Sequence, residues 1–222
     1  MTADPELREG RPPLRADARR NRDQILQAAR KLFGERGPEA PMEEIAKAAG
    51  VGVGTLYRRF PDREALIRAV AEDAFGFLNE AAHLAKREES SGWDALVRLL
   101  SQTKRLQVSV QLAMLSARAQ AILRDDPEIN RLRLDLLDVL DELVRAAQAE
   151  GSMREDVGTG DVAILASSLL LRKPQDASEE FVRLAPERCL VLMLDGLRAR
   201  PGSPLPGRAL TSDDLFQSRR KP

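Results

Sequence analysis

A hydroxyl, a phenol and two guanidinium groups follow one another in the run TLYRRF at residues 55–60. The apolar members of this run, Leu56 and Phe60, are spaced i, i+4 and therefore share one face of a helix. The polar members are left on the outer face: Thr55, Tyr57, Arg58 and Arg59. Such groups on a short helix are suited to the bases and phosphates of the DNA major groove. The same pattern would also fit a helical hairpin whose arginines are simply solvated.

The residues before this run predict two more helices and a tight turn. The segment MEEIAKAA at residues 42–49 is typical of a short helix, and Gly50 can adopt the positive φ that a helix C-terminus favours. Ala46 and Ala49 are small enough for a close approach of the next helix, and Val51 is an apolar plug at the turn. An upstream stripe predicts a third helix across this hairpin: Ile25, Ala28, Ala29, Leu32 and Phe33.

At these residues the chain resembles the TetR family of bacterial transcription regulators. The signature consists of ILQAARKLF at 25–33, Gly37, Ile45 with Ala46, AGV at 49–51, GTLY at 54–57, Phe60 and REAL at 63–66. A weaker likeness to the C-terminal half of the family lies in AQAEGSMRED at 147–156 and LDGLR at 194–198. The resemblance implies that the Tyr57 hydroxyl meets a phosphate. It also implies that Gly54, Thr55 and Arg58 lie close to the groove.

Four further arginines could hold the DNA backbone. Arg19, Arg20 and Arg22 precede the apolar stripe, where positive charge opposes the dipole of the expected first helix. We expect them to contact phosphates or the minor groove. Arg63 falls in the first turn of the following helix, which is also unfavourable for a cation, and the resemblance implies a backbone contact there. The alternatives are a flexible basic leader and a solvated surface arginine.

Two residues depart from the family pattern. Pro41 stands where the family often has Thr or Ser before the second helix, and Gly52 stands where it often has Ser before the third. Both changes remove a hydroxyl that could cap a helix or bind a phosphate. We therefore expect DNA affinity to depend on arginines more than is usual in the family.

The distribution of charge supports a DNA-binding head. The 222 residues carry no net charge, which alone would argue against a strongly basic nucleic-acid binder. Residues 1–63 nevertheless hold thirteen Lys or Arg and ten Asp or Glu, a net charge of +3, which the remainder must balance. A mildly basic head on a mildly acidic body fits a protein that grips DNA at one end.

Other classes of protein find little support. The single cysteine, Cys189, forms no intramolecular disulfide and fits a reducing compartment. No apolar stretch is long enough to span a bilayer, and no signal peptide is recognisable, so we expect a soluble, cytoplasmic protein. His83, the only histidine, is expected on the surface. Because phosphate-binding loops, metal-ligand clusters and Cys–His pairs are missing, we predict no enzymatic activity, no metal and no cofactor.

No segment alternates with period two, so we predict an all-α protein. A disordered leader is expected over 1–14, a helix-turn-helix DNA-binding domain over 15–63, a helical ligand-binding and dimerisation domain over 64–200, and a flexible tail over 201–222. Helices of the body are expected near 62–86, 93–105, 108–123, 127–150, 161–171 and 186–198. Asp126 should cap the helix that begins with Pro127.

Two surfaces of the body are candidates for function. The helices at 161–171 and 186–198 are apolar nearly all round, which predicts a dimer surface, although a monomeric core would also explain them. Its expected residues are Val162, Leu165, Leu169, Leu190, Leu194 and Leu197. A ligand cavity is expected at the centre of the body, with Met153 as a further apolar candidate for its wall. Its expected lining residues are Trp93, Gln107, Gln111, Met114, Leu115 and Arg118, for each of which core packing or solvent exposure is the competing interpretation.

Together these observations predict a sequence-specific transcription regulator, most often a repressor in the family. A homodimer would hold successive major grooves of a palindromic operator about 34–36 Å apart. An unidentified small-molecule effector would release it. The alternative is a helical module that binds a protein partner and does not respond to a ligand.

Overall fold

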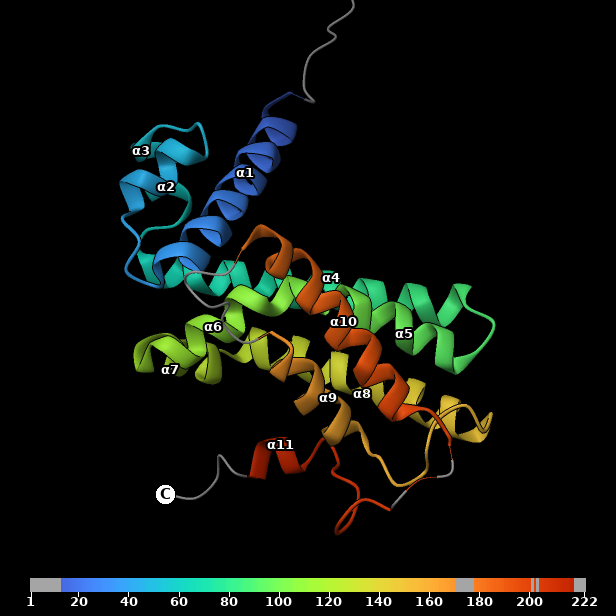
Figure 1. Cartoon of the computed structure of the whole chain (residues 1–222). Helices are drawn as coiled ribbons and strands as arrows, with labels where there is room; N and C mark the ends of the chain where they lie inside the picture. Colours follow the sequence, from blue (N-terminus) through green and yellow to red (C-terminus); the bar gives the residue numbers. More distant parts are fainter. Residues whose placement is uncertain (1–12, 171–177, 201, 203, 218–222) are drawn as a thin grey trace, which may run out of the picture. The chain divides into compact units, whose positions relative to one another are not determined.

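The computed structural model describes residues 13–170, 178–200, 202 and 204–217 (Figure 1). Within these ranges every regular element is helical, apart from one isolated antiparallel bridge between Met153 and Arg198. The chain divides into two compact units between Leu66 and Ile67, here called the head and the body. This confirms the predicted all-α class.

The head consists of α1 (Pro13–Arg36), α2 (Met42–Ala48) and α3 (Val53–Arg59). Its core is built from the stripe that the sequence indicated, and every member is less than 9% exposed: Ile25, Ala28, Ala29, Leu32 and Phe33. Leu56 of α3 and the small Ala46 of α2 are each 0% exposed, and Phe60 is 5% exposed. The inward face of the predicted hairpin is therefore confirmed.

Gly50 forms the turn between α2 and α3 in the way the sequence predicts. Its φ is 67°, a left-handed conformation that costs a glycine little. Gly50 N donates to Lys47 O at 3.1 Å, and Val51 N donates to Ala46 O at 3.0 Å, which is the Schellman pattern. These bonds satisfy carbonyls at the end of α2 and fix the direction in which α3 starts.

The first helix begins earlier than the sequence predicts. We expected Arg19, Arg20 and Arg22 in a segment before the helix, but α1 starts at Pro13 and contains all three. Proline is tolerated at a first helical position, and Arg and Ala, which dominate the next residues, are good helix formers. The disordered leader predicted for 1–14 falls almost entirely outside the described residues.

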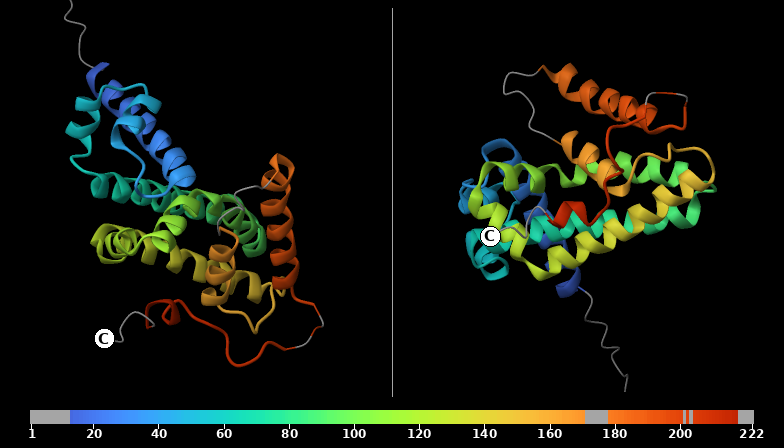
Figure 2. Two further views of the ribbon diagram at one scale, coloured as in Figure 1. Left: turned by 60° about the vertical axis from the view of Figure 1, so that its left-hand side comes forward. Right: turned by 90° about the horizontal axis from the view of Figure 1, so that it is seen from below.

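The body contains the remaining helices. They are α4 (Arg63–Glu88, which starts in the head), α5 (Gly92–Gln102), the 3-10 helix η1 (Thr103–Leu106), α6 (Gln107–Leu115), α7 (Ala117–Asp125), α8 (Pro127–Ala149), α9 (Thr159–Ser168), α10 (Glu179–Leu197) and the short α11 (Asp214–Gln217) (Figures 1 and 2). None of the helices in the described ranges is long and apolar enough to cross a bilayer.

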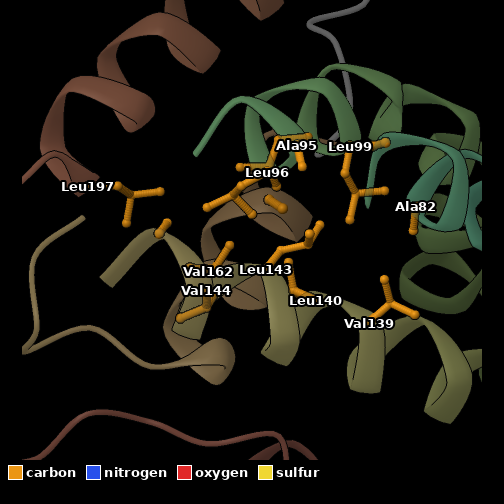
Figure 3. Close-up of a cluster of buried hydrophobic side chains, with 14 of the residues drawn as sticks. Ala82, Ala95, Leu96, Leu99, Val139, Leu140, Leu143, Val144, Val162 and Leu197 are labelled. Carbon is orange, nitrogen blue, oxygen red and sulfur yellow. The ribbon is translucent and has the colours of Figure 1, made fainter. Parts of the chain in front are cut away.

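The body core lies between α4, α5, α8, α9 and the end of α10 (Figure 3). Leu96 of α5 and Val162 of α9 are 0% exposed, and Leu143 of α8 is 3% exposed. Gly92 is needed where α5 meets α8, because a Cβ there would lie 2.6 Å from the Cβ of Ala146. Burial of this apolar surface is the main force that holds the body helices together.

Polar residues set several helix boundaries. Asp126 caps α8, since its Oδ1 accepts hydrogen bonds from the N–H groups of Glu128 and Ile129, both at 3.0 Å. This confirms the predicted cap before Pro127. The single helix expected over 108–123 is divided into α6 and α7, because Ser116 is extended and its Oγ accepts from Ala119 N at 3.2 Å.

The last long helix begins before the predicted position. Ser178 caps α10, and its Oγ accepts a hydrogen bond from Phe181 N at 3.2 Å. Pro186 was expected to open this helix but lies inside it. Ser178 followed by two glutamates supplies both a cap and a favourable charge for the helix dipole, so the helix starts about two turns before the proline.

Residues 204–217 lie against the body, although the sequence assigns them to a flexible tail. Leu210 O accepts a hydrogen bond from Gly160 N at 2.8 Å, and Leu210 N donates to Asp161 Oδ2 at 2.9 Å. Leu215 packs against the body core. Gly158 and Gly160 allow this approach, because a Cβ at either position would overlap the backbone of residues 210–211.

Candidate nucleic-acid interface

The outer face of α3 carries the polar groups that the sequence placed there. Tyr57 is 40% exposed, and Gly54, Arg58 and Arg59 are exposed, whereas Thr55 is half-buried. Buried Leu56 behind them anchors the helix to the head. Within the described head, α3 thus presents a hydroxyl, a phenol and two guanidinium groups on one rigid support, which can donate hydrogen bonds to phosphates and base edges.

Two of these side chains are joined to each other. Arg58 Nη2 donates a hydrogen bond to Thr55 Oγ1 at 3.2 Å, across one turn of α3. The hydroxyl therefore helps to orient the guanidinium. A pre-oriented arginine loses less side-chain entropy when it binds.

Tyr57 contacts the preceding helix. Its hydroxyl donates a hydrogen bond to Glu43 Oε1 of α2 at 3.2 Å. Desolvation and this hydrogen bond, in that order, raise the pKa of Tyr57. Because the ordinary pKa of a phenol, about 10, already lies well above physiological pH, Tyr57 carries its proton there and can act as a donor.

Arg63 opens α4 and folds back onto the loop between α1 and α2. Its Nη1 donates to Glu39 Oε2 at 2.6 Å and to the carbonyl of Pro38 at 3.2 Å. The side chain is 30% exposed, while Glu39 is 83% exposed. Arg63 thus lies at the surface of the head, but its charge is partly compensated there.

The helix starts in the head lack hydroxyl caps, as the sequence indicated. Neither Pro41 before α2 nor Gly52 before α3 makes a side-chain capping hydrogen bond. Arg19 and Arg20 are exposed on α1 and Arg22 is half-buried, so these predicted contacts project from a helix and not from a flexible arm.

The predicted ligand-site residues differ in exposure, from buried in the body core to exposed on a helix. Trp93 is only 4% exposed and belongs to the body core, with the guanidinium of Arg198 4.4 Å from the centre of its ring. Met153 is also buried in that core. Gln107 and Gln111 are half-buried on α6, and Arg118 is exposed on α7. The side chains of Met114 and Leu115 lie outside the described part of the structure.

Two buried polar atoms of the body were not singled out from the sequence. Asn79 on α4 and Ser109 on α6 are 8% and 6% exposed. Asn79 Nδ2 donates to Leu132 O at 2.8 Å, but neither Asn79 Oδ1 nor Ser109 Oγ has a hydrogen-bond partner in the structure. For Asn79, the signal available in the sequence is its place directly after Leu78, within an apolar helical stripe.

The predicted dimer residues differ in exposure. Val162 and Leu197 are 0% and 2% exposed within one chain, so they cannot contact a second chain, and we correct the prediction for these two. Leu165 is 42% exposed, and Leu169, Leu190 and Leu194 are half-buried. The structure adds exposed apolar neighbours on the same two helices: Ile164, Phe181, Val191 and Leu192.

Comparison with known proteins decides the family. Residues 25–70 match the bacterial regulatory proteins of the tetR family, and residues 91–199 match the SbtR-like transcriptional regulator C-terminal domain. The transcriptional repressor AcnR of Corynebacterium efficiens is 32% identical over 144 residues, which is 62% of this chain and 71% of AcnR. This chain belongs to the TetR family of transcription regulators.

Solved structures of TetR regulators have the same fold. The regulator SCO0520 from Streptomyces coelicolor is 32% identical, with a TM-score of 0.58 over 80% of this chain and 98% of that one. A TetR regulator from Mycobacterium vanbaalenii is 33% identical, with a TM-score of 0.55 over 84% of this chain and 99% of its own. The resemblance seen in the sequence is thereby confirmed.

Membership of the TetR family gives the head its function. The chain is a DNA-binding transcription regulator with a helix-turn-helix in α2 and α3, and it is not an enzyme. TetR regulators bind operator DNA, usually as dimers that respond to small-molecule effectors.

Proposed function

We propose that this TetR regulator is a repressor that binds a palindromic operator as a homodimer and is released by a small-molecule effector. The outer face of α3 carries the proposal, because buried Leu56 and Phe60 hold Thr55, Tyr57 and Arg58 outward on a rigid helix. AcnR is a repressor, which supports repression and not activation by this regulator.

DNA contacts are proposed for two groups of residues. Gly54, Thr55, Tyr57 and Arg58 would face the major groove and its nearest phosphates. Arg19, Arg20, Arg22 and Arg63 would contact the backbone beside it. The absence of hydroxyl caps at Pro41 and Gly52 supports this division, because basic side chains must then supply more of the phosphate contacts.

The homodimer is proposed to form through α9 and α10. Ile164 and Leu165 of α9 are 44% and 42% exposed, and Val191 and Leu192 of α10 are 54% and 67% exposed. Several exposed apolar side chains on two helices of a monomer are typical of a protein interface. A two-fold axis at this surface would also give two heads for two half-sites.

The effector is proposed to bind in the body near Asn79 or Ser109. A buried polar atom without a partner calls for an explanation, and a ligand that supplies the missing hydrogen bond is one. The buried polar side chains of the described body are Asn79, Ser109 and Thr159, none of which is ionisable. Thr159 is satisfied, because its hydroxyl donates to Asp141 at 2.6 Å. Since burying an unpaired charge is costly, the buried part of the effector would be uncharged.

Selection of bound DNA from a random pool tests the DNA-binding half of the proposal. We expect a two-fold symmetric consensus, with tight binding to it at physiological salt. Tyr57→Phe should weaken binding to this operator without changing the thermal stability of the protein. Enrichment of no sequence, or of a site without two-fold symmetry, would contradict the palindromic operator.

A thermal-shift screen of neutral and charged small molecules tests the effector half. Compounds that raise the melting temperature should also release the selected operator. Asn79→Leu or Ser109→Ala should reduce the stabilisation by ligand while operator binding persists, because a ligand shifts an equilibrium only by its differential affinity for the two states. If only charged compounds stabilised the protein, the proposal that the buried part of the effector is uncharged would be wrong.

A further inference from the structure

Two of the proposed phosphate-binding groups are already bound by carboxylates of the same head. Arg63 Nη1 lies 2.6 Å from Glu39 Oε2, and the Tyr57 hydroxyl lies 3.2 Å from Glu43 Oε1. The partners are 24 and 14 residues apart in the sequence, so the fold and not local chain geometry brings them together. A carboxylate and a phosphate are the same kind of acceptor for these donors.

Glu39 has no evident role in the stability of a helix. It lies in the loop between α1 and α2, is 83% exposed, and accepts a hydrogen bond from Arg63. Glu43 differs, because it lies in the first turn of α2, where a carboxylate also interacts favourably with the helix dipole. A substitution of Glu39 therefore tests its charge next to Arg63 without also changing the stability of a helix.

A phosphate that approaches Arg63 either displaces the Glu39 carboxylate or binds next to it and is repelled by its negative charge. Either event weakens the gain from the new contact. The same holds for Tyr57, whose hydroxyl already donates to Glu43 at 3.2 Å and would have to exchange that carboxylate for a phosphate oxygen.

We propose that Glu39 and Glu43 compete with the DNA backbone for Arg63 and Tyr57, and thereby limit how tightly the regulator holds DNA. This inference rests on the proposed DNA contacts of Arg63 and Tyr57. Because phosphates carry no sequence information, the competition reduces binding to every duplex by a similar factor. It keeps the regulator easier to release from DNA.

The test uses the full chain and a fluorescent duplex of about 30 base pairs of random sequence, which is long enough for two half-sites one helical turn apart. Glu39→Gln keeps the shape and an acceptor oxygen but removes the charge. We expect it to tighten binding by about 2- to 5-fold per protomer, the range measured for exposed ion pairs. Glu43→Gln should act in the same direction.

Two further measurements make the test specific. Glu35→Gln, at an exposed glutamate of α1, removes the same charge from the head and should change affinity less than Glu39→Gln. In an Arg63→Ala background the gain from Glu39→Gln should largely disappear. An equal gain in that background, or an equal gain from Glu35→Gln, would reduce the effect to net charge and overturn the proposal.

The single variants separate this inference from the proposed function. If Arg63→Ala weakens DNA binding but Glu39→Gln does not strengthen it, the competition is refuted and the phosphate contact stands. If neither variant changes DNA binding, the contact of Arg63 with DNA is itself refuted.

Discussion

Arg58 and Thr55 form a hydrogen-bonded pair on the outer face of α3, with Arg58 Nη2 3.2 Å from Thr55 Oγ1. The pair couples a residue at the start of the helix to one near its end. Removal of the Thr55 hydroxyl should therefore change the orientation of the Arg58 guanidinium. The two side chains should contribute to DNA recognition as a unit.

Thr55→Val, which keeps the shape but removes the hydroxyl, should weaken binding to the selected operator by about 5- to 100-fold, as expected for loss of one good base or phosphate contact. Arg58→Ala should have a similar effect. The double variant should lose less than the product of the two, because each single change already disturbs the pair. Fully multiplicative losses in a binding titration would show that the residues act independently.

Arg63→Ala should weaken binding about equally for all DNA sequences. Each lost phosphate contact lowers the slope of log affinity against log salt by about 0.9, so the slope of a dimer should fall by roughly one to two units. Titrations from low to physiological salt measure this directly. The matched variant Arg87→Ala removes one exposed charge from the end of α4 in the body and should leave the slope unchanged.

Leu192→Glu should convert the protein to monomers, because a charge at a side chain that is 67% exposed disturbs the interface and not the core. Leu134→Glu, at a leucine of α8 that is 48% exposed, is the control and should remain dimeric. Sedimentation at micromolar concentration distinguishes the two. A wild-type monomer under those conditions would refute the proposed interface.

Gly160→Val should detach the segment 204–217, because its side chain would overlap the carbonyl of Thr211. We expect faster proteolytic cleavage in that segment and destabilisation of roughly 1–3 kcal/mol, typical of a steric conflict. Gly76→Ala provides the contrast, because no atom lies within 4 Å of the added Cβ in the middle of α4. It should stabilise the body by about 0.5–1 kcal/mol.

The attachment of the same segment should resist acid. Arg154 donates to Asp156 at 2.6 Å, and together with the Leu205 N–H it lowers the pKa of Asp156 to about 2. A lowered pKa in the folded state means that the contribution of Asp156 to stability is present above pH 3.8 and is lost only as the pH falls through about 2. Cleavage near residue 205 should therefore stay slow at pH 4, and Asp156→Asn should accelerate it already at pH 7.

The sequence was most informative where a local rule decides the structure. The stripe from Ile25 to Phe33, the turn at Gly50 and the cap at Asp126 follow from helical periodicity, glycine conformation and capping, and all three are confirmed. The start of α10 differs from the prediction because a proline is more typical of the first turn of a helix than of its interior, whereas the cap is Ser178 and Pro186 lies inside the helix.

The contacts that depend on tertiary packing could not be read in this way. Nothing near Arg63 in the sequence indicates that Glu39 would reach it, and no composition rule attaches Leu210 to Gly160. Apolar periodicity also cannot separate a core from an interface, so it predicts Val162 at the dimer surface although this residue is buried within one chain. Such residues differ only in what the rest of the fold places over them.

Gly54 has no side chain, which leaves room on α3 for substitutions that could alter the DNA sequence this regulator prefers. An added Cβ at this position on the recognition helix would meet no atom within 4 Å, and the residue is exposed on α3. Side chains of many sizes could therefore be introduced there at little cost to folding, and each would present a different group on the outer face of α3, which we propose to face the base pairs. Position 54 is thus a natural place for new operator preferences to arise by single substitutions, in evolution or in the laboratory.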